Sequence, residues 1–331
     1  MASYDVVTLG ETMLRLNPPG FRRLEQATTL EVEVGGTESN LAIGLARLGL
    51  RVCWLSRLTA NPLGRIIAQT IAGHGVDTSR VIWTTEDRVG LLFFEEGSPP
   101  RSSRVWYDRQ HSAISRMRPE ELPEDMFQPG VARVLHLTGI TVALGPQAAA
   151  MAHRAMALAR AAGWLVSFDI NYRRQLWSQL EAVQGCEPFA QAADILFIPR
   201  GDACTLYGLD AAHPAEHLIA ALTTQYPQAT IALTLGQDGA IGATPDGDTC
   251  QQPAFPAAGI GRLGGGDAFA AGFLYAYLTT PEPHTRLAHA LAWGTAMAAL
   301  KYSVLGDIPI VERAEVEALL TQGGHSPRLW R

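Results

Sequence analysis

The most informative stretch of the chain is Gly259-Ile260-Gly261-Arg262-Leu263-Gly264-Gly265-Gly266-Asp267-Ala268-Phe269-Ala270-Ala271-Gly272-Phe273. Three consecutive glycines run into an aspartate, and the aspartate opens an apolar, alanine-rich run that is typical of a helix. Glycines let a ligand approach the backbone closely, and the first turn of a helix offers unpaired N–H groups to an anion. A carboxylate at such a place suits a reaction in which it accepts a proton. The alternative is a glycine loop with Asp267 as an ordinary helix cap.

A second glycine pair lies near the N-terminus, in Val34-Gly35-Gly36-Thr37-Glu38-Ser39-Asn40. The residues that follow, Leu41–Gly49, have the apolar spacing of a helix, with Thr37 or Ser39 as its cap and Gly49 as its stop. A tight turn alone would explain the glycines. The polar side chains of Glu38 and Asn40 are also candidates to face a ligand.

From residue 134 onward, strands and helices alternate regularly. Strands are predicted at Val134–Thr138, Trp164–Asp169, Asp194–Ile198 and Thr230–Leu235, with a long helix at Pro146–Ala162. Near the N-terminus, strands are predicted at residues 4–9 and at Arg51–Leu58, and a helix begins at Asn61-Pro62. Such alternation predicts an α/β fold: three layers, α/β/α, with a mostly parallel central sheet.

Short strands interrupt this alternation in two places. They fall within about residues 12–34 and 89–111, and the second pair flanks Gly97-Ser98-Pro99-Pro100 as a hairpin. We expect them to form a small β-sheet lid on a single domain that spans residues 1–331. Tyr107, Asp108 and Arg109 are expected on its last strand.

Composition excludes several classes of protein. A net charge of −6 argues against nucleic-acid and anionic-membrane partners. Lys301 is the only lysine, so a Walker phosphate loop and a protein-kinase lysine are both absent. The four cysteines are scattered and predict neither a zinc site nor a disulfide framework. No apolar leader or long apolar run is present, so a cytoplasmic protein is expected.

Three features, in order along the chain, match one known family: Val34-Gly35-Gly36-x-x-x-Asn40, Asp169-x-Asn171-x-Arg173 and Gly264-Gly265-Gly266-Asp267. On these features, the chain resembles the ribokinase-like (PfkB) carbohydrate kinases over essentially its whole length. The glycine run is similar to the family's Gly-Ala-Gly-Asp signature. Within the family, the pattern is most similar to 2-keto-3-deoxygluconate kinases, on the residues Leu137-Thr138-Gly139-Ile140-Thr141, Leu176-Trp177, Tyr107-x-Arg109 and Gly306-Asp307.

The resemblance implies ATP-dependent phosphorylation of a hydroxyl on a small sugar or sugar acid, with 2-keto-3-deoxygluconate as first choice. Asp267 would be the general base, and the N–H groups of Gly264, Gly265 and Gly266 would stabilise the transferring phosphoryl group. Residues implied to contact the sugar are Gly35, Gly36, Asn40, Tyr107, Arg109, Arg173 and Asp307. Residues implied to contact ATP are Arg173, Thr234, Gly236 and Gly239. Arg109 is the candidate for a substrate carboxylate, because a guanidinium holds both oxygens.

The resemblance also implies Mg²⁺, for which Asp202 is the candidate ligand, and a possible homodimer or higher homo-oligomer through the lid. The chain departs from the family pattern at three positions. Gly261 replaces a usual aspartate, which puts activation by a monovalent cation in doubt. Pro199-Arg200-Gly201-Asp202 replaces Asn-x-x-Glu, and Leu92 stands where close relatives often have tyrosine.

Three alternatives remain open. One is a kinase for a neutral sugar of the fructose or ribose type. A second is a sugar-binding relative with impaired catalysis, for which Gly261 and Pro199 are the indications. A dinucleotide-dependent dehydrogenase ranks last, because Leu9-Gly10-Glu11-Thr12 does not supply Gly-x-Gly-x-x-Gly after the first strand.

Overall fold

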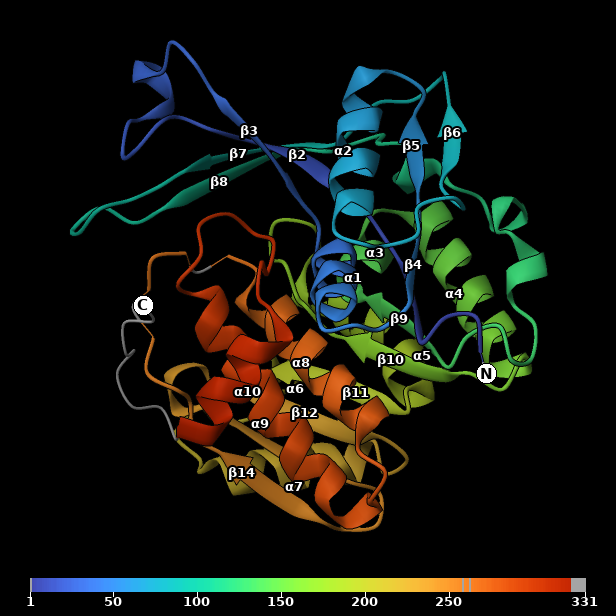
Figure 1. The fold of residues 1–331 in the computed structure, drawn as a ribbon, viewed down its shortest axis with the longest axis vertical. Helices are drawn as coiled ribbons and strands as arrows, with labels where there is room; N and C mark the ends of the chain where they lie inside the picture. The colour runs from blue at the N-terminus through green and yellow to red at the C-terminus, as the bar shows by residue number, and fades with distance from the viewer. Residues whose placement is uncertain (1, 258, 262, 323–331) are drawn as a thin grey trace.

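The central sheet is the largest element of the computed structural model, which describes residues 2–257, 259–261 and 263–322 (Figure 1). Within these residues it has eight strands in the order β14-β13-β12-β11-β10-β9-β1-β4. Their bounds are β1 Val6–Leu9, β4 Val52–Leu55, β9 Val134–Thr138, β10 Leu165–Asp169, β11 Ile195–Pro199, β12 Thr230–Thr234, β13 Ala240–Ala243 and β14 Thr249–Gln252. In this order, the strands from β12 to β4 are parallel to one another. β13 is antiparallel to β12, and β14 is antiparallel to β13. The predicted mostly parallel sheet is confirmed.

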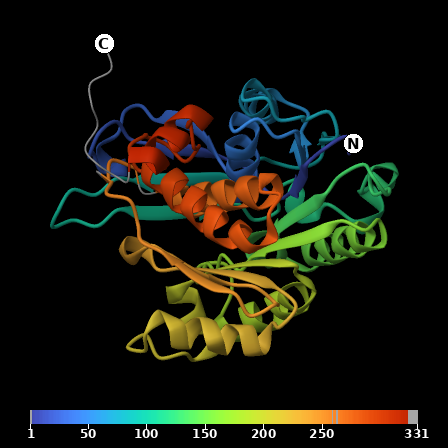
Figure 2. The ribbon, with the colours of Figure 1, turned by 60° about the horizontal axis from the view of Figure 1, so that its bottom comes forward.

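Helices cover both faces of the sheet (Figure 2). Each face has its own apolar core. One core, with Phe168 and Phe189, involves α4 Pro146–Ala161, α5 Gln179–Ala192, α6 Arg200–Tyr207 and α7 Ala215–Gln225. The other, with Leu41 and Phe273, involves α1 Thr37–Arg47, α2 Pro62–Gly73, α8 Gly265–Thr279, α9 Pro283–Lys301 and α10 Arg313–Gln322. A short helix, α3 Gly139–Ala143, follows β9. None of the described helices is long and apolar enough to cross a bilayer.

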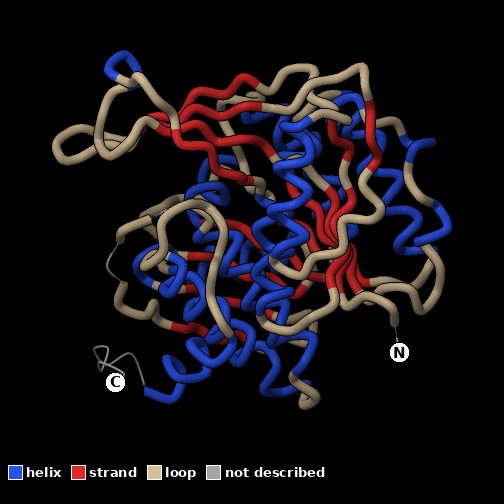
Figure 3. Tube along the Cα trace, turned by 45° about the horizontal axis from the view of Figure 1, so that its top comes forward, coloured by secondary structure: helices blue, strands red, loops and turns tan. Residues whose placement is uncertain are grey.

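The lid is a separate sheet that projects from one end of the molecule (Figure 3). Its strands are β2 Met13–Asn17, β3 Glu31–Gly35, β7 Leu91–Glu95 and β8 Arg104–Asp108, in the order β3-β2-β7-β8. Both predicted insertions therefore contribute to it, and β7 and β8 pair as an antiparallel hairpin. Arg109 lies just after β8 and not on it.

The predicted strand over Arg51–Leu58 is two strands in two sheets. After β4 the chain leaves the main sheet at Ser56, whose hydroxyl donates to the Gly10 carbonyl at 2.8 Å. It continues as β5 Arg57–Thr59, which pairs with β6 Ile82–Thr84. The apolar pattern runs through the break because both strands are largely buried.

Two helices begin earlier than predicted, and these two helix starts build the site. Helix α1 begins at Thr37 with Gly36 as N-cap, and α8 begins at Gly265 with Gly264 as N-cap. A prediction from the spacing of apolar residues places the start of these helices too late, because the side chains of their first turns are polar. These polar side chains are nevertheless buried. Glu38, Asn40 and Asp267 are at most 9% exposed.

Candidate active site

Asp267 lies where the first turns of α1 and α8 meet. Its Oδ1 accepts a hydrogen bond from the Thr37 hydroxyl at 2.5 Å, and its Oδ2 accepts from Asn40 Nδ2 at 2.7 Å. The N-cap of α8 is Gly264, so the alternative reading of Asp267 as an ordinary cap is wrong. The carboxylate is instead held by side chains of another helix.

A network of polar side chains connects Asp267 to the end of β10. Asn171 Nδ2 donates to Thr37 Oγ1 at 3.1 Å and to Asp169 Oδ2 at 3.0 Å. Burial raises the pKa of Asp267, against the effect of the Thr37 and Asn40 hydrogen bonds. Burial, followed by the charges of Asp267 and Asp202, raises the pKa of Asp169 to about 7. Because their pKa values are raised, both carboxylates take up a proton more readily than a solvent-exposed aspartate does.

The three glycines before Asp267 have different structural reasons to lack a side chain. Gly264 has φ +73°, the left-handed region that glycine adopts without strain. A Cβ at Gly265 would lie 2.5 Å from the Tyr302 ring. A Cβ at Gly266 would meet no atom within 4 Å, so that position opens onto free space. The first turn of α8 therefore borders an unfilled volume at Gly266, and the N–H groups of a first helical turn have no partner within the helix.

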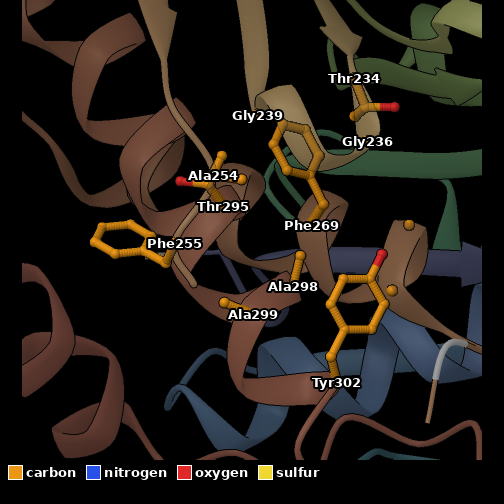
Figure 4. A pocket seen from close by; sticks show the side chains of 12 residues that line it. Thr234, Gly236, Gly239, Ala254, Phe255, Phe269, Thr295, Ala298, Ala299 and Tyr302 are labelled. Atoms are coloured by element: carbon orange, nitrogen blue, oxygen red, sulfur yellow. The ribbon is translucent and has the colours of Figure 1, made fainter. Parts of the chain in front are cut away.

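A cavity with mainly apolar walls lies on one side of the glycine run (Figure 4). Three of the four residues that the resemblance implies for ATP, Thr234, Gly236 and Gly239, line it from the end of β12 and the turn after it, whereas the fourth, Arg173, does not line this cavity. Aromatic rings of Phe255, Phe269 and Tyr302 contribute further walls, with Ala298 and Ala299 of α9 beside them. Gly265 and Gly266 form its remaining edge.

A second, more polar cavity lies under the lid. It brings together all seven residues predicted to contact the sugar: Gly35, Gly36, Asn40, Tyr107, Arg109, Arg173 and Asp307. Asp267 and the three glycines also line it. The two cavities therefore meet at Gly265 and Gly266, which line both.

Buried oxygen atoms in the lid-side cavity lack partners. Glu11 Oε1, Asn40 Oδ1 and Asn171 Oδ1 accept no hydrogen bond from any part of the chain that the structure describes. Buried polar atoms are rarely left unpaired. These acceptors therefore suit a ligand that carries several hydroxyl groups.

Two charged residues of this cavity are already paired. Arg109 donates through Nε to Glu11 Oε2 at 2.7 Å and also through Nη2. Asp307 forms an ion pair with Arg15, which also contacts Glu33 at 2.5 Å. Burial raises the pKa of Asp307 to about 6 although Arg15 opposes this.

Arg173 differs from these two residues, because within the described ranges no carboxylate lies at ion-pair distance from it. Its Nη1 donates to the Tyr172 carbonyl at 3.2 Å.

The sequence did not single out Glu11, Arg15 or Thr37 as site residues. Arg15 had a detectable signal, since it is a charged residue within the apolar strand Met13–Asn17.

The positions that depart from the family pattern also have distinct surroundings. Asp202 lines neither cavity, and its Oδ2 accepts from the Tyr172 N–H at 2.9 Å. Among the residues that the structure describes, no group of three His, Cys, Asp or Glu side chains could hold a metal ion. Pro199 and Leu92 line the lid-side cavity. A Cβ at Gly261 would overlap the Val304 carbonyl oxygen, so a side chain is excluded there in this backbone conformation.

Comparisons with known proteins agree on one family. The pattern of the "pfkB family carbohydrate kinase" matches residues 3–313. A 2-dehydro-3-deoxygalactonokinase from Haloferax volcanii is 37% identical over 96% of this chain and 97% of its own length. A 2-dehydro-3-deoxygluconokinase from Bacillus subtilis is 32% identical over 92% and 91%. The crystal structure of 2-dehydro-3-deoxygluconokinase from Thermotoga maritima superposes with a TM-score of 0.88 at 30% identity, covering 96% and 98%.

The family match over residues 3–313 includes the residues of both cavities and of the lid. The match confirms the three-layer α/β/α architecture and the resemblance carried by the glycine motifs. The chain belongs to the pfkB family of carbohydrate kinases.

Proposed function

We propose that this kinase transfers the γ-phosphoryl group of ATP to a hydroxyl of a 2-keto-3-deoxy sugar acid. The observation that carries the proposal is the meeting of the two cavities at Gly265 and Gly266, with Asp267 on the lid side only. A nucleotide in the apolar cavity would direct its phosphates toward these glycines. A sugar under the lid would then present a hydroxyl to Asp267.

In this mechanism, the Asp267 carboxylate accepts the proton of the attacking hydroxyl. Thr37 and Asn40 hold the carboxylate in one orientation, which limits the motion needed to reach the reaction geometry. The N–H groups at the start of α8 stabilise the charge on the transferring group. Arg173, from the end of β10, adds a positive charge in the same cavity.

Magnesium fits the acidic character of this site, because Asp169 lies close enough to Asp267 and Asp202 for their charges to raise its pKa. Magnesium commonly binds through one or two carboxylates plus the phosphates of the substrate. Asp169, which lines the lid-side cavity, is the residue that would hold it, and Asp202, which lines neither cavity, would contribute only its charge. When bound, the ion shields the negative charge of the ATP phosphates.

The sugar-acid assignment is supported by the two arginines of the lid-side cavity and by the activities of the relatives. Arg173 has no carboxylate partner among the described residues, and Arg109 uses only Nε and Nη2 for Glu11. A substrate carboxylate would find donors on both guanidiniums. The three unpaired acceptor oxygens suit the hydroxyl groups of the same molecule.

A neutral sugar is the second candidate, and a specific observation favours it. Arg109 and Asp307 are neutralised by Glu11 and Arg15 within the protein, so part of the fixed charge of the cavity is already balanced. Under this alternative, fructose or ribose would bind through hydroxyl contacts alone.

A substrate panel tests the proposal. Purified protein with Mg·ATP is given 2-keto-3-deoxygluconate, its C4 epimer 2-keto-3-deoxygalactonate, fructose and ribose, and ADP release and ³¹P NMR of the product are followed. We expect kcat/KM for a keto-deoxy acid to exceed that for either neutral sugar by at least about 100-fold, the value of one buried charge-assisted contact. Turnover of a neutral sugar alone contradicts the sugar-acid assignment, and sugar binding without any turnover supports an impaired relative.

The lid offers a surface for self-association. Exposed apolar side chains gather on it, with Val32 of β3 at 54% exposure and Trp106 of β8 at 41%. Since open sheet edges and apolar faces favour pairing, we expect a homodimer by light scattering. Val32→Glu should convert it to a monomer, whereas a monomeric parent protein contradicts this expectation.

A further inference from the structure

Lys301 is a buried cation outside both cavities. It is the only lysine of the chain, lies at the C-terminus of α9 and is fully buried. A lysine at a helix end normally extends into water beside the last carbonyls. Burying an ammonium group is costly unless a specific interaction compensates for it. Its position therefore requires a structural reason.

The ammonium group bonds to the loop that follows its own helix. Lys301 Nζ donates to the Val304 carbonyl at 3.0 Å. The same loop accepts hydrogen bonds at the Tyr302 carbonyl from the N–H groups of Ile260 at 2.9 Å and Gly261 at 3.2 Å. Lys301 thus closes a loop whose backbone supports the segment before the glycine run.

The fit between this loop and the glycine segment is close. A Cβ at Gly261 would overlap the Val304 carbonyl, the acceptor that Lys301 uses, and a Cβ at Gly264 would overlap the Asp307 carbonyl. Any movement of residues 301–307 would therefore change the position of the glycine run. Asp307 also lines the lid-side cavity, so the same movement would reach the substrate.

The charges around Lys301 compensate in part for its burial. Burial lowers the pKa of Lys301, while Asp307 and Asp267 raise it and Arg15 lowers it. An ammonium has three N–H donors, and Val304 is its one acceptor among the described residues.

We propose that Lys301 is a positioning residue of the reaction: its ammonium is a built-in monovalent cation that holds residues 301–307 against Ile260, Gly261 and Gly264 and so fixes the glycine run. This inference rests on the proposed phosphoryl transfer at Gly265 and Gly266. Gly261 and Lys301 are then linked through one group, the Val304 carbonyl. This carbonyl excludes a side chain at Gly261 and accepts the hydrogen bond from the Lys301 ammonium. Turnover should not depend on added potassium or ammonium ions.

The charge and burial of Lys301 are tested without any substrate. Protein labelled with [¹⁵N]lysine gives a single side-chain signal, because the chain has one lysine. We expect an ammonium signal at pH 7 with protons that exchange slowly with water. A neutral amine, or an ammonium in rapid exchange, overturns the proposal. This experiment remains informative even if no sugar of the panel is phosphorylated.

Kinetic rescue tests the positioning role. Lys301→Ala removes the cation and leaves space, whereas Lys301→Met removes the cation and fills the space. We expect both to lower kcat on the order of 100-fold, since misplacement of about 1 Å costs that much, with smaller changes in KM. Ethylammonium should restore kcat at least 10-fold in Lys301→Ala and leave Lys301→Met unchanged.

Met297→Ala is the matched control, because Met297 is fully buried one turn earlier on α9 and carries no charge. It should lower the melting temperature without showing amine rescue. Wild-type kcat in Lys301→Met, the same amine response in Met297→Ala, or no amine response in folded Lys301→Ala overturns the proposal. If Lys301→Ala does not fold, Lys301→Met and the NMR experiment decide.

Discussion

Replacing Asp267 with asparagine should separate the stability of this site from its chemistry. The carboxamide has the shape of the carboxylate, so its oxygen can keep the Asn40 bond while its NH₂ group donates to the Thr37 hydroxyl oxygen. Because burial raises the pKa of Asp267 above the unfolded value, the charged form destabilises the folded protein at pH values above that unfolded value, near 4. Asparagine removes this cost. We therefore expect an equal or higher melting temperature at pH 7, with a difference that shrinks toward pH 4.

Turnover should change in the opposite direction. Loss of a positioned general base costs about 10²- to 10⁴-fold in rate, so kcat should fall on the order of 10³-fold, which corresponds to about 4 kcal/mol in the activation barrier. The assay is ADP release at saturating Mg·ATP, with sugar affinity measured by calorimetry. Sugar binding should change less than about threefold. A kcat within tenfold of the parent enzyme refutes the role of Asp267 as base.

Three further predictions concern the surroundings of Asp267. Gly266→Ala should alter the free energy of unfolding by no more than about 1 kcal/mol, because the added Cβ meets no atom within 4 Å. It should nevertheless lower kcat at least about tenfold, because the methyl group fills the space proposed for the phosphoryl group. An unchanged kcat contradicts the proposal that the phosphoryl group occupies this space. Arg109→Ala should raise KM for acid substrates much more than for neutral sugars, and combining it with Glu11→Gln controls for the carboxylate left unpaired; equal effects on both substrates argue against a carboxylate contact. The profile of kcat/KM against pH should fall on the acid side with an apparent pKa well above 4, because burial raises the pKa values of Asp267 and Asp169; an acid limb at or below pH 4 disagrees with a buried base.

Strands of the fold were predictable where side-chain patterns are strong. The parallel strands are apolar runs followed by polar residues, and the lid strands are bounded by proline and glycine. Strands β13 and β14 were not predicted, because Ala240–Ala243 contains small residues and Thr249–Gln252 is mostly polar. β13 becomes a strand through pairing with β12, and β14 through pairing with β13, which is a tertiary effect that overrides weak intrinsic preference.

For the site, the resemblance to a family named residues that line one cavity, but not their partners. Gly36, Asn40 and Asp267 belong to the motifs that carry the resemblance, so the sequence singled them out. The pairs Glu11–Arg109 and Arg15–Asp307 join positions 98 and 292 residues apart, and no local pattern reports such contacts. Ion pairs of this kind decide which charged side chains of a cavity remain available to a ligand. For this reason, the identity of the substrate was the weakest inference from the sequence.

The boundary between the two cavities has a consequence for how such enzymes diversify. Among the described residues, only Gly265 and Gly266 line both, and they contribute backbone and no side chain. Under the proposed function, mutations at Phe255 or Ala298 would change the choice of phosphate donor, and mutations at Leu92 would change the choice of acceptor, with little interference between the two. Acceptor and donor specificity would then evolve separately, and an engineer could select for one while leaving the other intact.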